Sequence, residues 1–174
     1  MAIDTGIGIS IDLVSTITAA GDGAQAPLGQ TLLKPAGIST QGEQVWIYIK
    51  AGDSLVAGDI CARDTTVATL GSLENVIKVP ASSATSRVVG VAQHAIPAGS
   101  FGWVLKSGVG ALTVVVPAST TESAGEAVVV SGTPGQATAA GAGADAFGFL
   151  TQDLANGTGS PVVFATTAVI NCNG

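Results

Sequence analysis

The chain has 174 residues, of which 47% are hydrophobic and 10% are charged, and its formal net charge is −6. High hydrophobicity with little charge excludes an intrinsically disordered chain, and an acidic chain with six scattered basic residues is not suited to neutralising nucleic-acid phosphates. No apolar stretch reaches the ~20 residues of a membrane-spanning helix. The N-terminus carries Asp4 and no basic residue, so we expect no secretory signal, no membrane partner and synthesis in the cytoplasm.

Residues 1–44 are predicted to form an extended N-terminal arm. Pro27 and Pro35 interrupt regular structure across much of it. Near its start, large apolar side chains alternate with small or polar ones, and these are Ile7, Ile9, Ile11 and Leu13. Two interpretations stay open for this alternating segment. It adds as a strand to the sheet edge of a neighbouring molecule, or it is the first strand of the chain's own barrel.

From residue 45 onward, period-two alternation between glycine-rich turns predicts short β-strands. We therefore expect an all-β fold, either a β-barrel or a β-sandwich. Trp46 and Tyr48 share a face with Lys50 and are expected to be exposed contact residues. Phe101 and Trp103 share one face of a later strand and are expected to close the barrel core.

Residues 45–174 also contain a weak internal repeat. The stretch LVAGDICARD (55–64) is echoed by ESAGEAVVVSG (122–132). In the same order, RVVGVAQHAIPAG (87–99) is echoed by DAFGFLTQDLANG (145–157). The repeat predicts two similar β units, at about 45–116 and 117–174.

The chain offers little catalytic or metal-binding chemistry. His94 is the single histidine and has no acid near it in the sequence, so it is interpreted as a hydrogen-bonded or solvated side chain beside a turn. Cys61 and Cys172 lie far apart without a neighbouring histidine, which is not a zinc pattern, and are interpreted as free buried thiols. We expect no enzyme activity, no cofactor and no metal.

Acidic residues and one lysine allow two further interpretations. Asp53, Asp59 and Asp64 lack the spacing of a calcium-binding loop, so Gly-Asp turns are favoured. Lys78 follows paired Gly-Asp turns and resembles the modified lysine of lipoyl and biotinyl carrier domains. Ile77, however, stands where those families place an acid or a methionine.

Five stretches, taken together, resemble the capsid decoration, or cement, proteins of tailed bacteriophages: PLGQTL (27–32), VWIYIKAGDSLVAGD (45–59), VVGVAQHAIPAGSFGWVLKSG (88–108), AGEAVVV (124–130) and FGFLTQD (147–153). The similarity covers roughly residues 27 to 155 and includes no catalytic signature. It implies a β-rich protein, often trimeric, that binds the outside of an assembled shell and stabilises the head. The acidic pI of about 4.4 fits an external position away from DNA.

We therefore expect a structural virion protein that binds the outer surface of a tailed-phage capsid and cements neighbouring major capsid protein subunits. Its expected partners are the major capsid protein and further copies of itself, with a trimer favoured. The alternative is a carbohydrate-binding or adhesin-type module of a phage fibre or tail, with Trp46 and Tyr48 as a stacking platform. The candidate capsid or oligomer contacts are Ile7, Ile9, Ile11, Leu13, Trp46, Tyr48, Phe101 and Trp103.

Deleting residues 1–26 is expected to weaken attachment to capsid shells while the β domain stays folded, because the arm would give main-chain hydrogen bonds to a neighbour. Binding of the truncated and full-length chains to purified shells measures the effect, and thermal unfolding of each chain reports the fold. Unchanged affinity of the truncated chain would contradict the arm hypothesis.

Overall fold

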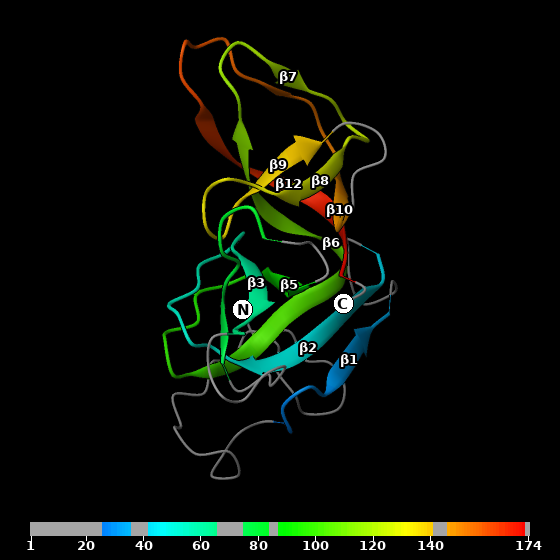
Figure 1. Ribbon diagram of the computed structural model, residues 1–174. Coiled ribbons are helices and arrows are strands. Elements are labelled where there is room, and N and C mark those ends of the chain that lie inside the picture. The colour runs from blue at the N-terminus through cyan, green and yellow to red at the C-terminus, as the bar shows by residue number, and fades with distance from the viewer. Residues whose placement is uncertain (1–25, 36–41, 66–74, 84–86, 141–145, 173–174) are drawn as a thin grey trace.

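The computed structural model describes residues 26–35, 42–65, 75–83, 87–140 and 146–172, and the elements among them are β-strands (Figure 1). The strands are β1 (Thr31–Lys34), β2 (Gln44–Lys50), β3 (Ile60–Arg63), β4 (Val76–Lys78), β5 (Val88–Ala92), β6 (Phe101–Val116), β7 (Thr121–Glu122), β8 (Ala127–Val130), β9 (Ala137–Ala140), β10 (Gly148–Leu150), β11 (Leu154–Ala155) and β12 (Val162–Asn171). The prediction of an all-β fold is confirmed. In this part of the chain no helix is long and apolar enough to cross a membrane.

The long strand β6 links the two halves of the molecule, as Figure 1 shows. Its first half pairs with β2 on one side and with β5 on the other. Its second half pairs with β12 over the whole length of that strand. The β-branched and aromatic side chains that fill β6 favour such an extended backbone.

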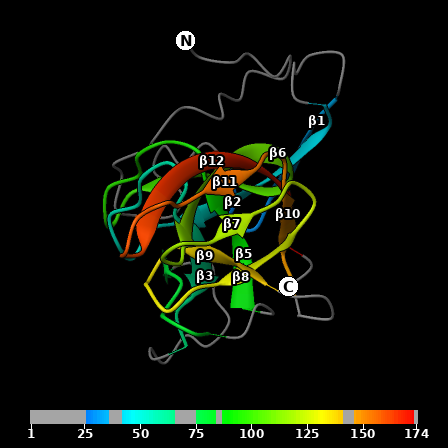
Figure 2. The same cartoon turned by 90° about the horizontal axis from the view of Figure 1, so that it is seen from above.

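The C-terminal half is a five-stranded mixed barrel. From β6 the antiparallel pairing runs through β12, β10, β8 and β9. The strand β9 returns to β6 through a parallel pairing of Ala137 with Val114, which closes the ring. Figure 2 looks down on this ring, with β12, β10, β8 and β9 arranged around it. We call it the C-terminal barrel.

The N-terminal half repeats the same order of strands. Antiparallel pairing runs from β2 through β6, β5 and β3 to β4. A parallel bridge joins Val76 of β4 to Ala51, the residue after β2, and closes this second ring, which we call the N-terminal barrel. Two similar β units are therefore present and share β6. The boundaries at 45–116 and 117–174 stay a prediction.

The repeat extends to two turns, one that precedes β3 and one that precedes β8. The amide of Gly58 donates to the carbonyl of Ala92, and the amide of Gly125 donates to the carbonyl of Leu150, each at 2.8 Å. The two glycines have φ values of +90° and +87°, a left-handed conformation that side chains disfavour. The echo between the two Ala-Gly-acid motifs therefore reflects one turn geometry used twice.

The acid after each of these glycines has the same task. The amide of Val56 donates to Oδ2 of Asp59, and the amide of Ser123 donates to Oε2 of Glu126, both at 2.8 Å. In each case the carboxylate satisfies a backbone donor that the tight turn leaves without a strand partner. The acid is thus part of the turn.

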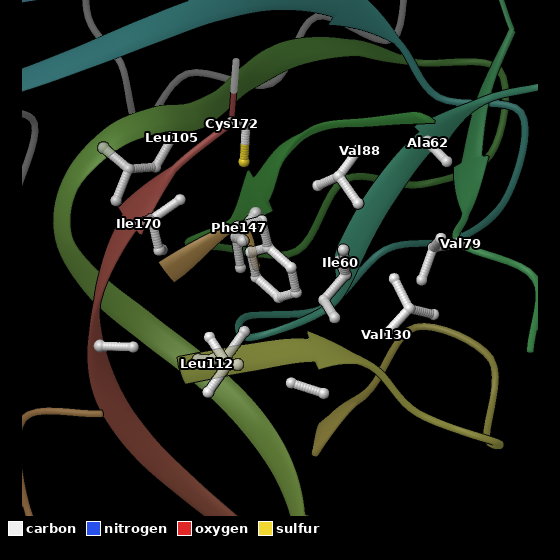
Figure 3. Packing of buried hydrophobic residues seen from close by; sticks show 14 of the residues in the cluster. Ile60, Ala62, Val79, Val88, Leu105, Leu112, Val130, Phe147, Ile170 and Cys172 are labelled. Atoms are coloured by element: carbon white, nitrogen blue, oxygen red, sulfur yellow. The ribbon is translucent and has the colours of Figure 1, made fainter. Parts of the chain in front are cut away.

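Alternate side chains along β2 enter different hydrophobic clusters, as period-two alternation predicts. Ile47 and Ile49 belong to a smaller cluster with Val104, inside the N-terminal barrel. Trp46 and Tyr48 belong to a larger cluster, which also contains the interior of the C-terminal barrel. Figure 3 shows part of the larger cluster, where side chains of both barrels, among them Ile60, Val88, Phe147 and Val130, lie together. This shared core holds the two barrels together.

Part of the predicted arm is built into the sheet. Strand β1 pairs antiparallel with β2, with Thr31 opposite Ile47. Leu32 and Ala26 are buried and belong to the larger cluster. Residues 1–25, including the alternating segment from Ile7 to Leu13, lie outside the described residues, so the arm itself stays a prediction. A truncation that tests it should end at residue 25, because Ala26 contributes to the core.

Replacing Gly90 by alanine is expected to destabilise the fold by about 1–3 kcal/mol, as overpacking does. An added Cβ would lie 2.8 Å from the backbone oxygen of Leu105 on β6, where the backbone cannot move without breaking the sheet. Gly132→Ala is the matched control, because its added Cβ meets nothing within 4 Å. Urea unfolding of both variants measures the difference, and equal stabilities would show that β5 and β6 do not approach this closely.

Candidate functional site

The segment 94–108 forms a bonded turn followed by the first half of β6. The amide of Gly99 donates to the carbonyl of Ala51 at 2.7 Å. Ile96 is fully buried and is paired with Leu55 by an antiparallel bridge. The turn is therefore held against residues 51–55 by both backbone and side chains, in agreement with its interpretation as a rigid structural turn. His94 lies just before it and is half-buried.

Each aspartate considered for a calcium loop has a partner within the fold. Asp59 forms an ion pair with Lys78, with 2.9 Å between Oδ2 and Nζ. Asp53 accepts a hydrogen bond from the backbone amide of Lys78 at 3.1 Å, and Asp64 accepts one from Nδ2 of Asn75 at 2.6 Å. Within the described ranges, no three His, Cys, Asp or Glu side chains gather as metal ligands. The turn interpretation accounts for these carboxylates.

Lys78 does not have the surroundings that a carrier lysine needs. It ends the short strand β4, and its side chain is 34% exposed and paired with Asp59. A lysine that carries a prosthetic group has to project freely from a hairpin so that the group can reach other active sites. The ion pair favours a structural role for Lys78, which ties β4 to the turn before β3.

Two acids, Glu122 and Glu126, lie close together beside the turn before β8. Partial burial, and then the nearby Glu126 carboxyl, raise the pKa of Glu122. Glu126 is already used by the turn before β8, and Asp153 nearby accepts a hydrogen bond from the amide of Ala124 at 2.7 Å. Glu126 and Asp153 therefore serve to hold this turn.

The four candidate aromatic contacts lie inside the protein. Tyr48 and Trp103 are fully buried with ring centroids 5.0 Å apart, and Phe101 stacks on Tyr48 at 6.1 Å. Trp46 is 4% exposed. Phe101 and Trp103 are core residues, as expected, but they belong to the larger cluster and do not lie in the interior of the N-terminal barrel.

The expected exposure of Trp46 and Tyr48 is wrong. Lys50, which motivated it, places its Nζ 5.6 Å from the Phe101 ring centroid at the rim of the aromatic cluster. Lys50 at the end of β2 therefore does not show that the other side chains on the same face of the strand, Trp46 and Tyr48, are exposed. A contact role for the four rings stays a prediction, which their burial does not favour. The other four candidates, from Ile7 to Leu13, lie outside the described residues.

The exposed hydrophobic side chains are different residues from those that the sequence pointed to. In the described part of the chain the large exposed ones are Leu33, Val56, Phe149, Val163 and Val169, at 39–54% exposure. Leu33 lies on β1, and three of the others gather on β10 and β12. The alternation in VVFATTAVIN (162–171) is the sequence signal that could have found the last two. These side chains are the candidate contact surface.

No protein-family model and no curated protein matches this chain. Among solved structures, the chain is similar to the head fiber gp8.5 N base in bacteriophage phi29, with a TM-score of 0.45 and 16% sequence identity. The match covers 74% of this chain and 95% of that chain. An identity and a TM-score this low are insufficient to transfer a function.

The two cysteines are expected to be unreactive in the native protein. Burial raises the pKa of Cys172 to about 12 and raises the pKa of Cys61 further, so neither forms the reactive thiolate near neutral pH. Titration with an aromatic disulfide reagent at pH 8 should label no thiol before unfolding and both thiols in denaturant. Rapid labelling of the folded protein would show that one of these sites is open to solvent.

Proposed function

We propose that this chain is a structural virion protein that binds the outside of a tailed-phage capsid and cements neighbouring major capsid protein subunits. The observation that carries the proposal is the exposure of large apolar side chains at separate places on one folded body. A chain with 10% charged residues gains little solubility from charge, so such surfaces favour a protein partner. The resemblance to capsid decoration proteins implies that this protein partner is the major capsid protein of an assembled shell.

Cementing needs one body that touches more than one neighbour, and the architecture suits this task. Leu33 lies on β1, at the edge of the N-terminal barrel, whereas Phe149 and Val169 lie on the C-terminal barrel (Figure 1). The continuous backbone of β6 keeps the two places at a fixed separation. Several weak contacts made by one such body add to a firm attachment on a repetitive shell.

The proposed role is non-enzymatic and uses no cofactor or metal. The described aspartates and Glu126 accept hydrogen bonds or form an ion pair within the fold. The proposed partners are the major capsid protein and further copies of the chain, with a trimer favoured. A net charge of −6 is not suited to binding nucleic acid and is suited to the outer surface of a head that encloses DNA.

The carbohydrate-binding alternative loses the feature that motivated it. A stacking platform needs aromatic rings that are open to a sugar face, and Tyr48 and Trp46 are 0% and 4% exposed. The apolar side chains that are exposed are mainly aliphatic and offer no such rings apart from Phe149. The decoration role is therefore favoured.

Leu33→Glu is expected to weaken binding to purified heads that lack this protein by at least about tenfold, since a contact residue would bury a charge without a partner. The side chain is 54% exposed, so the fold should tolerate the change. Thr133→Glu, in the exposed turn between β8 and β9, is the matched control. Co-sedimentation with heads measures the affinity, and wild-type binding by Leu33→Glu would argue against this contact.

A further inference from the structure

On four described strands of the C-terminal barrel, β6, β8, β10 and β12, the side chains that face outward form a surface without a charge. Burial alternates along β12 and along the second half of β6, and cross-strand partners such as Val163 and Val115 lie on the same side. The face consists of Val109, Ala111, Thr113, Val115, Val163, Ala165, Thr167, Val169, Phe149, Ala127 and Val129. We call this set the outer face; its members are valine, alanine, threonine and one phenylalanine.

The outer face contains an exposed hydrophobic pair near the C-terminal end of β12. Phe149 on β10 lies directly opposite Val169 on β12, and the two are 49% and 39% exposed. Val163, further along β12, is 53% exposed. Three large apolar side chains on one uncharged sheet surface are more typical of an interface than of a face that stays in water.

The internal repeat allows the exposure of this pair to be compared with that of the equivalent pair in the N-terminal barrel. Val91 on β5 lies opposite Leu105 on β6, which is the position that Phe149 opposite Val169 holds in the C-terminal barrel. Val91 and Leu105 are both fully buried in the larger cluster. The equivalent pair is therefore covered in one barrel and exposed in the other.

We propose that a second copy of this chain covers the outer face. Two chains of net charge −6 repel each other wherever their acidic residues meet, so copies associate best through a surface that carries no charge. The outer face is such a surface, and its small side chains allow close packing of one sheet on another. A basic partner would instead be recognised by acids, and the outer face has none. This inference deepens the self-association in the proposed function.

The first test is the mass of the protein in solution, which needs no capsid. The wild-type chain, of 16.9 kDa, should sediment as an oligomer at micromolar concentration. Phe149→Glu should weaken the association by about a hundredfold or more, giving monomers, since each contact would bury a carboxylate without a partner. Thr133→Glu adds the same charge to an exposed turn and should leave the mass unchanged. Thermal unfolding of each variant checks that it is folded.

The second test is chemical crosslinking through the same face. Ala165 is small, exposed and central on β12, and the native thiols are buried. Ala165→Cys should give covalent dimers with a short bis-maleimide in dilute solution, whereas Thr133→Cys should not. This test does not depend on how Phe149→Glu folds.

The outcomes separate this inference from the proposed function. A wild-type monomer, or no crosslinked dimer through residue 165, overturns the second copy as the occupant even if the protein binds heads. If the wild type is monomeric and Phe149→Glu impairs head binding, a capsid subunit covers the outer face and the inference is wrong. An oligomer that Phe149→Glu disrupts supports the inference, even if neither protein binds a shell.

Discussion

The backbone hydrogen bonding along β6 is the interaction on which the rest of the structure depends. One uninterrupted strand supplies a wall to each barrel, so neither ring of strands closes without it. Because the ladder continues from one ring into the next, the two barrels cannot turn freely against each other. The larger hydrophobic cluster, which takes side chains from both, adds to this coupling. The proposed cementing role would benefit from a rigid joint of this kind.

Glycine and the few acids serve this architecture. At Gly58 and Gly125 the left-handed backbone makes the turn that starts a strand, and the following acid satisfies a backbone amide. Where strands approach closely, as Gly90 does to β6, the absence of a side chain is what permits the approach. Much of the ionisable chemistry is therefore used to hold backbone in place. This explains how a chain so poor in charge still needs its aspartates where they are.

The two barrels differ in what covers them. The face built around Tyr48 and Trp103 is buried within the described structure, whereas the equivalent face around Phe149 and Val169 is exposed. The N-terminal unit therefore has this face covered by its own chain, and the C-terminal unit has the equivalent side chains Phe149 and Val169 available for association. The proposed attachment and the proposed self-association both use surfaces other than those of Trp46, Tyr48, Phe101 and Trp103, the aromatic residues that the sequence pointed to.

The sequence by itself determined the fold class, the positions of the turns and the repeat of two β units. Alternation and glycine spacing are local properties, and main-chain geometry responds to them directly. It also identified Phe101 and Trp103 as core residues, because aromatic side chains on one strand face need a common interior. Only the tertiary structure decided which of the two faces of each strand is exposed. Trp46 and Tyr48 are buried and Val169 is exposed because burial depends on what packs over a sheet, and period-two alternation is the same for a covered face as for an open one.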